Sequence, residues 1–121
     1  MSQHASLSPE RWARFTADQQ LMMIANEMNR ASKLMAPADR ERLKSAYARV
    51  LQLTDLTVAV RPERGLRREL LRWRDLVAGL WLEPGSSPAV HREALRHLLL
   101  FSFQTARQIP FVLGDARTTP P

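Results

Sequence analysis

Residues 39–60 read DRERLKSAYARVLQLTDLTVAV and carry the longest helical pattern in the chain. Apolar side chains recur there at steps of three and four residues, which places them on one face of a helix. Asp39 and Glu41 suit the first turn, where acidic groups interact favourably with the positive end of the helix dipole. Pro62 moves Arg61 away from helical angles, so the helix should end before it. The predicted buried face comprises Leu43, Ala46, Tyr47, Val50, Leu53, Thr57 and Val60.

Three further segments show the same periodicity, and short breaks separate them. Ala36-Pro37 and Pro84-Gly85-Ser86 are turn sequences, and the segments between and beyond them carry apolar residues at helical spacing. The periodicity predicts helices over about 17–35, 65–82 and 88–108 in addition to 39–60.

The N-terminal part of the chain contains two helix-start signals. Ser8 can cap a short helical turn that has Pro9 at its first position. Thr16 and Gln19 have the spacing of a capping box, in which each side chain bonds the other residue's backbone N–H. These signals predict a short extra helical turn, followed by a helix that begins near residue 17.

The four long helices should have similar lengths of about 30 Å and short connections. Such helices favour antiparallel neighbours, because a short connection returns the chain alongside the helix that it has just left. We therefore expect residues 1–121 to form one all-α domain, an antiparallel (up-down-up-down) four-helix bundle, with a flexible tail over 110–121.

The composition and the lengths of the apolar runs argue against disulfide-bonded, secreted and membrane-inserted proteins. The chain has no cysteine, which excludes disulfides and thiolate metal sites and is compatible with a reducing cytoplasm. The N-terminus lacks the pattern of a secretory signal, and apolar runs such as 98–101 are far shorter than the roughly 20 residues of a membrane span. We expect a cytoplasmic protein that is not inserted in a membrane and binds no metal or cofactor. A role other than catalysis is favoured over an enzyme.

Residues 88–108 carry more apolar surface than one buried face requires. Ala94, Leu98, Phe101 and Thr105 form one side, whereas a second side also reads as apolar. A helix that is apolar on most sides needs cover on most sides. We therefore predict a homodimer through this helix, with help from the methionines of 17–35, which suit adaptable contacts. The predicted interface comprises Leu95, Leu99, Phe103, Ala106, Met22 and Met23.

An alternative leaves the chain monomeric. The extra apolar residues could pack under the N-terminal segment, where Trp12 and Phe15 need partners, or under the tail with Phe111 and Val112.

Arginine is concentrated at the start of the helix predicted over 65–82. The net charge is +6, and lysine occurs only at Lys33 and Lys44. Cations at the positive end of a helix dipole destabilise the helix. Helix stability therefore does not explain why arginines are placed there. Phosphate binding is one explanation, and a solvated face in a chain with a general arginine bias is the other. The predicted phosphate-binding residues are Arg64, Arg67, Arg68 and Arg72.

Residues 92–97, REALRH, place Arg92 and His97 five positions apart. This spacing resembles the Arg-x(4–6)-His pattern of the HEPN ribonucleases, which are also small all-helical proteins. In that family the arginine and the histidine act on the RNA phosphodiester, so the resemblance implies Arg92 and His97 as catalytic residues. The family usually has Asn or Asp after the arginine, and Glu93 stands there in this chain.

Mid-helix charges are the last feature that the sequence singles out. Glu27 lies at the edge of its predicted buried face, and we expect it to pair with a residue of another helix, for instance Arg74. Such a pair would fix the register of the helices. Asp55 is a second charge of this kind, within 39–60.

Two hypotheses of function follow from these features. The first is a non-enzymatic helical module that self-associates and binds another protein, and it rests on the apolar surplus of 88–108. The alternative is a basic RNA- or DNA-binding bundle, including a HEPN-like ribonuclease that uses Arg92 and His97. The two differ in the salt dependence of nucleic-acid binding, which should be steep only for the second.

Overall fold

The computed structural model describes residues 7–114, and every regular element in this part of the chain is a helix. The all-α prediction is therefore confirmed. The predicted flexibility of 115–121 concerns residues outside the described range. The elements are α1 (Pro9–Trp12), α2 (Ala17–Ala31), the 3-10 turn η2 (Pro37–Asp39), α3 (Arg40–Val60), α4 (Arg64–Leu82), α5 (Pro88–Leu99), α6 (Phe103–Ala106) and α7 (Ile109–Val112).

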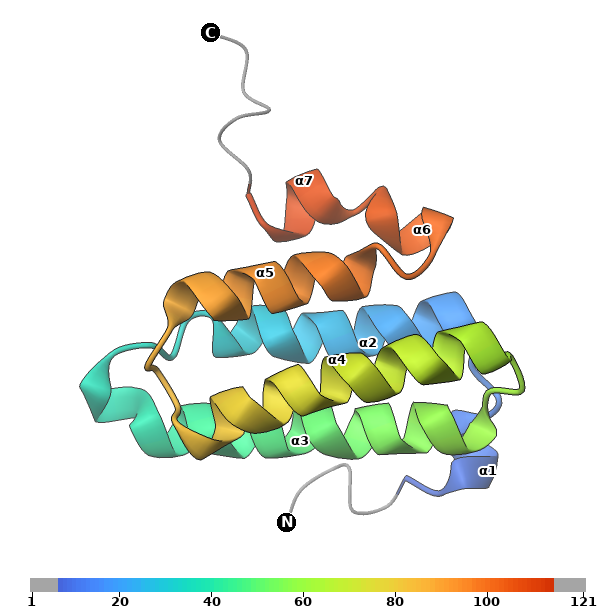
Figure 1. Ribbon diagram of the computed structural model, residues 1–121, viewed down its shortest axis with the longest axis horizontal. Coiled ribbons are helices and arrows are strands. Elements are labelled where there is room, and N and C mark those ends of the chain that lie inside the picture. Colours follow the sequence, from blue (N-terminus) through green and yellow to red (C-terminus); the bar gives the residue numbers. More distant parts are fainter. Residues whose placement is uncertain (1–6, 115–121) are drawn as a thin grey trace, which may run out of the picture.

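The four longest helices contact one another in a ring. α2 packs against α3, α3 against α4, α4 against α5, and α5 returns to α2. Figure 1 shows that successive helices of this ring run in alternating directions, and that α6 and α7 lie over the outer side of α5. α1 contacts α3, which fixes the N-terminal segment to one end of the ring.

The predicted start signals form as expected. Ser8 accepts a hydrogen bond from the backbone N–H of Arg11, and Pro9 is the first residue of α1. Thr16 and Gln19 form the capping box at the start of α2. At α5, the hydroxyl of Ser87 accepts from the N–H of Val90. Side chains thus satisfy N–H groups that would otherwise lack partners in the first turns.

Helix α2 is shorter than the predicted 17–35 because its last turn tightens. The Ser32 hydroxyl donates to the carbonyl of Asn29. The N–H of Leu34 donates to the carbonyl of Ala31, three residues back, as in a 3-10 turn. The starts of α3 and α4, at Arg40 and Arg64, differ from the predicted 39 and 65 by one residue each.

The helix predicted over 88–108 ends at Leu99. Ser102 has extended backbone angles and caps α6, because its hydroxyl accepts from the N–H of Thr105. The Thr105 hydroxyl is buried and donates to the carbonyl of Leu99 over 2.7 Å. The bond from Thr105 gives the carbonyl of Leu99 a partner at the end of α5. The chain reverses there, so the residues after Ser102 cover α5 instead of extending it.

Part of the predicted flexible tail is also helical. Ile109–Val112 forms α7, with Pro110 in its first turn. Proline suits that position because its missing N–H would have no partner there.

Candidate functional site

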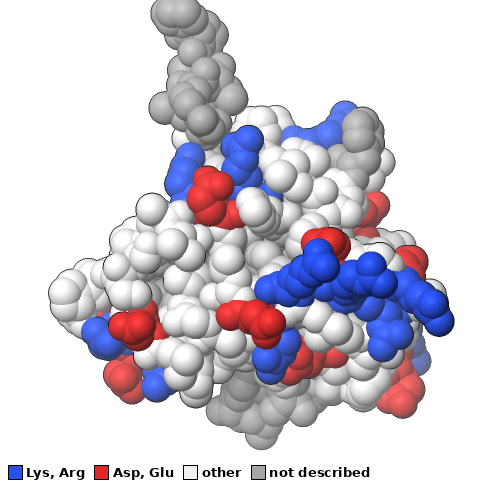
Figure 2. All heavy atoms as spheres, in the orientation of Figure 1, with Lys and Arg blue, Asp and Glu red and all other residues white. Residues whose placement is uncertain are grey.

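The outer face of α4 carries a dense group of exposed arginines. They line a shallow, open hollow that we call the arginine surface. Figure 2 shows its guanidinium groups as a continuous blue band over α4. The structure therefore brings the four predicted phosphate-binding residues together and exposes all of them to solvent. The arginine surface comprises Arg64, Arg67, Arg68, Leu71, Arg72, Arg74 and Asp75.

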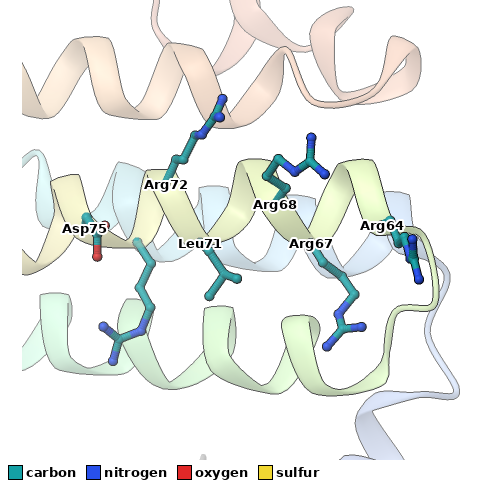
Figure 3. A pocket seen from close by; sticks show the side chains of 7 residues that line it. Arg64, Arg67, Arg68, Leu71, Arg72 and Asp75 are labelled. Atoms are coloured by element: carbon teal, nitrogen blue, oxygen red, sulfur yellow. The ribbon is translucent and has the colours of Figure 1, made fainter.

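The arginine surface has two rows because of helical geometry. Arg68 and Arg72 are four residues apart and point toward the α5 side, whereas Arg64 and Arg67 point toward the α3 side (Figure 3). Leu71 points toward the α3 side, as Arg67 does, and remains 48% exposed (Figure 3). An extended anion could therefore follow α4 with cations on both sides.

Carboxylates neutralise only part of this charge. Arg74 forms two hydrogen bonds to Asp55 of α3, over 2.6 and 3.2 Å, and these bonds raise the pKa of Arg74. Arg72 lies 3.5 Å from the carboxylate of Glu69. By contrast, Arg64, Arg67 and Arg68 form no ion pair with any residue between 7 and 114. No described carboxylate therefore competes with an external anion for these three guanidinium groups.

The start of α4 concentrates positive charge further. Glu63 precedes the helix without capping it, because its carboxylate accepts two hydrogen bonds from Arg61, each 3.1 Å long. The bonds from Arg61 also lower the pKa of Glu63. The first turn of α4 has no acidic residue and begins with Arg64. Positive side chains thus lie at the positive end of the helix dipole. This arrangement is unfavourable for the helix alone, and a bound anion would stabilise it.

Arg92 and His97 do not converge on one site. Residues five apart on an α-helix lie about 140° apart around its axis. Arg92 donates to the carbonyl of Leu113 over 3.3 Å and lines a cavity between α2, α5 and α7. His97 is exposed and does not line that cavity. This geometry gives the two predicted catalytic residues no common pocket.

His91 is buried, and the sequence did not single it out. Its Nε2 lies 2.9 Å from the carbonyl of Met28, and its Nδ1 lies 2.6 Å from the Tyr47 hydroxyl. Because a carbonyl only accepts, Nε2 carries the proton and Nδ1 accepts from Tyr47. Burial lowers the pKa of His91 and raises that of Tyr47 to about 12. Both groups are therefore neutral near pH 7, and they tie α2, α3 and α5 together.

We expect this buried histidine to make folding stability depend on pH. The pKa of His91 is lower in the folded chain than its ordinary value of 6.5, so the unfolded chain binds more protons. Stability is then fully present above about pH 6.5 and is lost as the pH falls toward the folded-state pKa, by at most about 1.4 kcal/mol per pH unit. Urea titrations between pH 7 and 5 should show this loss in the natural chain.

The matched control uses the exposed histidine of the same helix. His97→Gln should keep the pH dependence, whereas His91→Gln should be less stable at pH 7 and should lose the histidine contribution to the slope. Equal slopes in the natural chain and the His91→Gln variant would contradict the assignment.

The residues of the predicted dimer interface lie in different environments. Leu95 and Leu99 are 1% and 0% exposed within the single chain. Leu95 shares a small cavity with Val112, consistent with cover by the chain's own C-terminal segment. Ala106, Met22 and Met23 are partly buried, and the side chain of Phe103 is outside what the structure describes. Leu95 and Leu99, the two predicted interface residues that belong to α5, are thus covered within one chain.

Glu27 pairs with a residue of another helix, but the predicted partner, Arg74, is wrong. Glu27 is 6% exposed and lies 3.4 Å from Arg49 of α3 and 3.5 Å from Arg30 of its own helix. It thus pairs across helices, as expected, but with the neighbour on α3. Arg74 binds Asp55 instead.

Within residues 7–114, no group of three or more His, Asp or Glu side chains is arranged to hold a metal ion. None of the helices in this range has both the length and the apolar character needed to cross a membrane. Comparison of the chain with family models, curated proteins and solved structures gives no match, so the geometry of the chain itself must carry the functional argument.

Proposed function

We propose that this chain is a non-catalytic helical module that binds the phosphate backbone of nucleic acid through the arginine surface. One observation carries the proposal: Arg64, Arg67 and Arg68 share one exposed face of α4 and have no carboxylate partner among the described residues. These three arginines repel one another, and an anion that binds them would relieve that repulsion.

Arginine suits this role because of its shape. Its planar guanidinium binds a phosphate through two parallel hydrogen bonds and keeps its charge at any physiological pH. Arg64 and Arg72 are separated by about 12 Å along the axis of α4, at roughly 1.5 Å per residue. One strand of a nucleic acid presents a phosphate about every 3.4 Å of axis in B-form geometry, so several phosphates could contact the surface at once.

The scaffold that we propose is an antiparallel (up-down-up-down) four-helix bundle. The ring of contacts between α2, α3, α4 and α5 and their alternating directions support it. α4 exposes its arginines because its opposite face is buried, with Trp73 and Val77 in the core. We expect the module to act in the cytoplasm, as a chain without cysteine permits.

The other hypotheses have less support from the geometry. Catalysis would require Arg92 and His97 to act on one phosphodiester, and they lie on different sides of α5. Self-association remains a prediction, but Leu95 and Leu99 are covered within the chain and cannot supply its surface without rearrangement. The arginine surface is exposed without any rearrangement.

A salt titration tests the proposal. With four phosphate contacts, log K should fall with log[salt] at a slope of about −3 for single strands, so affinity drops about 50-fold between 50 and 200 mM salt. Fluorescence anisotropy with a labelled oligonucleotide measures both quantities. No detectable binding at 50 mM salt, with the chain folded by circular dichroism, would refute the proposal.

A further inference from the structure

An apolar notch lies beside the arginine surface, where the start of α4 meets the turn after α5. Its volume is about 320 Å³, within the roughly 300–1,000 Å³ of small-ligand pockets. Leu100 is 54% exposed, and Phe101 is partly buried. The exposed side of Leu100 therefore adds apolar surface to the rim of the notch. The notch is lined by Gly65, Leu66, Glu69, Leu100 and Phe101.

The notch continues directly from the row of arginines on the α5 side. Glu69 lines the notch and also pairs with Arg72, which belongs to the arginine surface. Gly65 and Arg68 lie on the same side of α4, because they are three residues apart. A ligand that places phosphates on Arg68 and Arg72 would therefore bring its next chemical group to the notch.

The chemistry of the notch fits a nucleobase. Leu66, Leu100 and Phe101 offer apolar and aromatic surface of the kind against which unstacked bases pack. The second carboxylate oxygen of Glu69 makes no hydrogen bond with a described residue. A carboxylate accepts hydrogen bonds from exocyclic amino groups, such as N4 of cytosine, and uracil has no such group.

Gly65 leaves the space that a base would need. A Cβ added at this position would meet no other atom within 4 Å. Gly65 is the second residue of α4, so the backbone of the first turn is open to approach there. The open position is consistent with a ligand that approaches the backbone of α4.

We infer that the chain binds single-stranded nucleic acid, with phosphates on the arginine surface and one unpaired base in the notch. This inference rests on the proposed function and adds the substrate class to it. A duplex keeps its bases stacked and paired, so it could occupy the arginine surface but not the notch. The amino group of the inserted base, where it has one, donates to Glu69.

The test compares a labelled RNA strand of cytidines with a strand of the same length and charge that lacks bases. We expect the strand with bases to bind about tenfold more tightly at equal salt, because stacking and the Glu69 contact are absent from the other. Cytidine strands should also bind more tightly than uridine strands, and Glu69→Gln should reduce that difference.

Gly65→Leu adds a bulky side chain to the lining of the notch and provides the decisive variant. It should remove the tenfold advantage of the strand with bases and leave binding of the base-free strand unchanged. Gly79→Leu is the matched control, because Gly79 is on the same helix, is equally free of neighbours and lies outside the notch. In Gly79→Leu, the strand with bases should still bind about tenfold more tightly than the base-free strand.

The results separate the two proposals. Equal binding of both strands by the natural chain would overturn the notch and leave phosphate binding intact. An advantage that survives in Gly65→Leu would likewise overturn the notch as the site of the base. Absence of binding to either strand at low salt would overturn the proposed function itself.

Discussion

Replacing Arg64, Arg67 and Arg68 together by alanine should weaken binding to single-stranded nucleic acid by on the order of 100-fold at 50 mM salt. Each of the three guanidinium groups lacks a carboxylate partner among the described residues, so each can neutralise a phosphate and release a counterion. The slope of log K against log[salt] should accordingly fall by about 2. Anisotropy titrations at several salt concentrations measure both effects.

The control must remove the same charge elsewhere. Arg11, Arg14 and Arg107 are exposed, form no ion pair with a described residue and lie outside the arginine surface. Their joint replacement by alanine also lowers the net charge by three. We expect less than a threefold loss of affinity from it, because long-range attraction is screened within about 10 Å at 0.1 M salt. Similar losses in the two triple variants would show that net charge alone, and not the arginine surface, attracts nucleic acid.

Stability distinguishes a binding role of these arginines from a structural one. Cations at the positive end of a helix are unfavourable, so Arg64→Ala should leave the midpoint of urea unfolding unchanged or raise it. A structural role would instead lower the midpoint along with the affinity.

The sequence predicted what depends on one helix or one turn. The capping box of Thr16 and Gln19 and the cap at Ser8 are local, and both form. The exposure of Arg64 and Arg68 is also local, because the spacing of Leu70, Trp73 and Val77 determines which face of α4 is buried.

The predicted end of the helix that starts at residue 88 is wrong because two sequence signals overlap there. The run Leu98–Phe101 continues the apolar pattern of α5, and it concealed Ser102 as the cap of a new helix. Spacing from Ser102 to Thr105 is that of an N-cap and its N3 residue, so a signal was present. The apolar periodicity extended past it, and a single overlong helix was predicted in place of a chain reversal.

The sequence could not predict which residues of distant segments meet. The notch combines Leu66 of α4 with Leu100 and Phe101 of the turn after α5, and no local pattern joins them. The bond between Tyr47 and His91 spans 44 residues. The partner of Glu27 likewise depends on the rotation of α2 relative to α3, which apolar spacing defines too coarsely to choose between Arg49 and Arg74.

Trp12→Ala should lower the free energy of unfolding by about 3–5 kcal/mol, the cost of removing a large aromatic side chain from a core. Trp12 is 0% exposed, although it belongs to a helix of only four residues. Its indole N–H donates to the Thr57 hydroxyl over 2.9 Å, and its carbonyl accepts from the side chain of Gln20 over 2.7 Å. The side chain thus joins α1 to α3, and the carbonyl joins it to α2.

Two companion variants separate packing from hydrogen bonding. Trp12→Phe keeps an aromatic ring but loses the bond to Thr57, whose hydroxyl still donates to the carbonyl of Leu53. Its cost should therefore be smaller than that of Trp12→Ala, because no buried hydroxyl is left without a partner. Arg14→Ala is exposed in the same segment and should change stability by less than about 0.5 kcal/mol. Urea unfolding followed by circular dichroism measures all three.

The outcome decides whether the N-terminal turn is part of the fold. A helix of four residues cannot persist alone in water, so α1 depends on contacts with the rest of the chain, and Trp12 is its buried residue. If Trp12→Ala unfolded at the same urea concentration as the natural chain, α1 would be an attachment that the four longer helices do not need. A loss of several kcal/mol would instead place residues 9–12 in the same cooperative unit as α3, because one side chain would then support both.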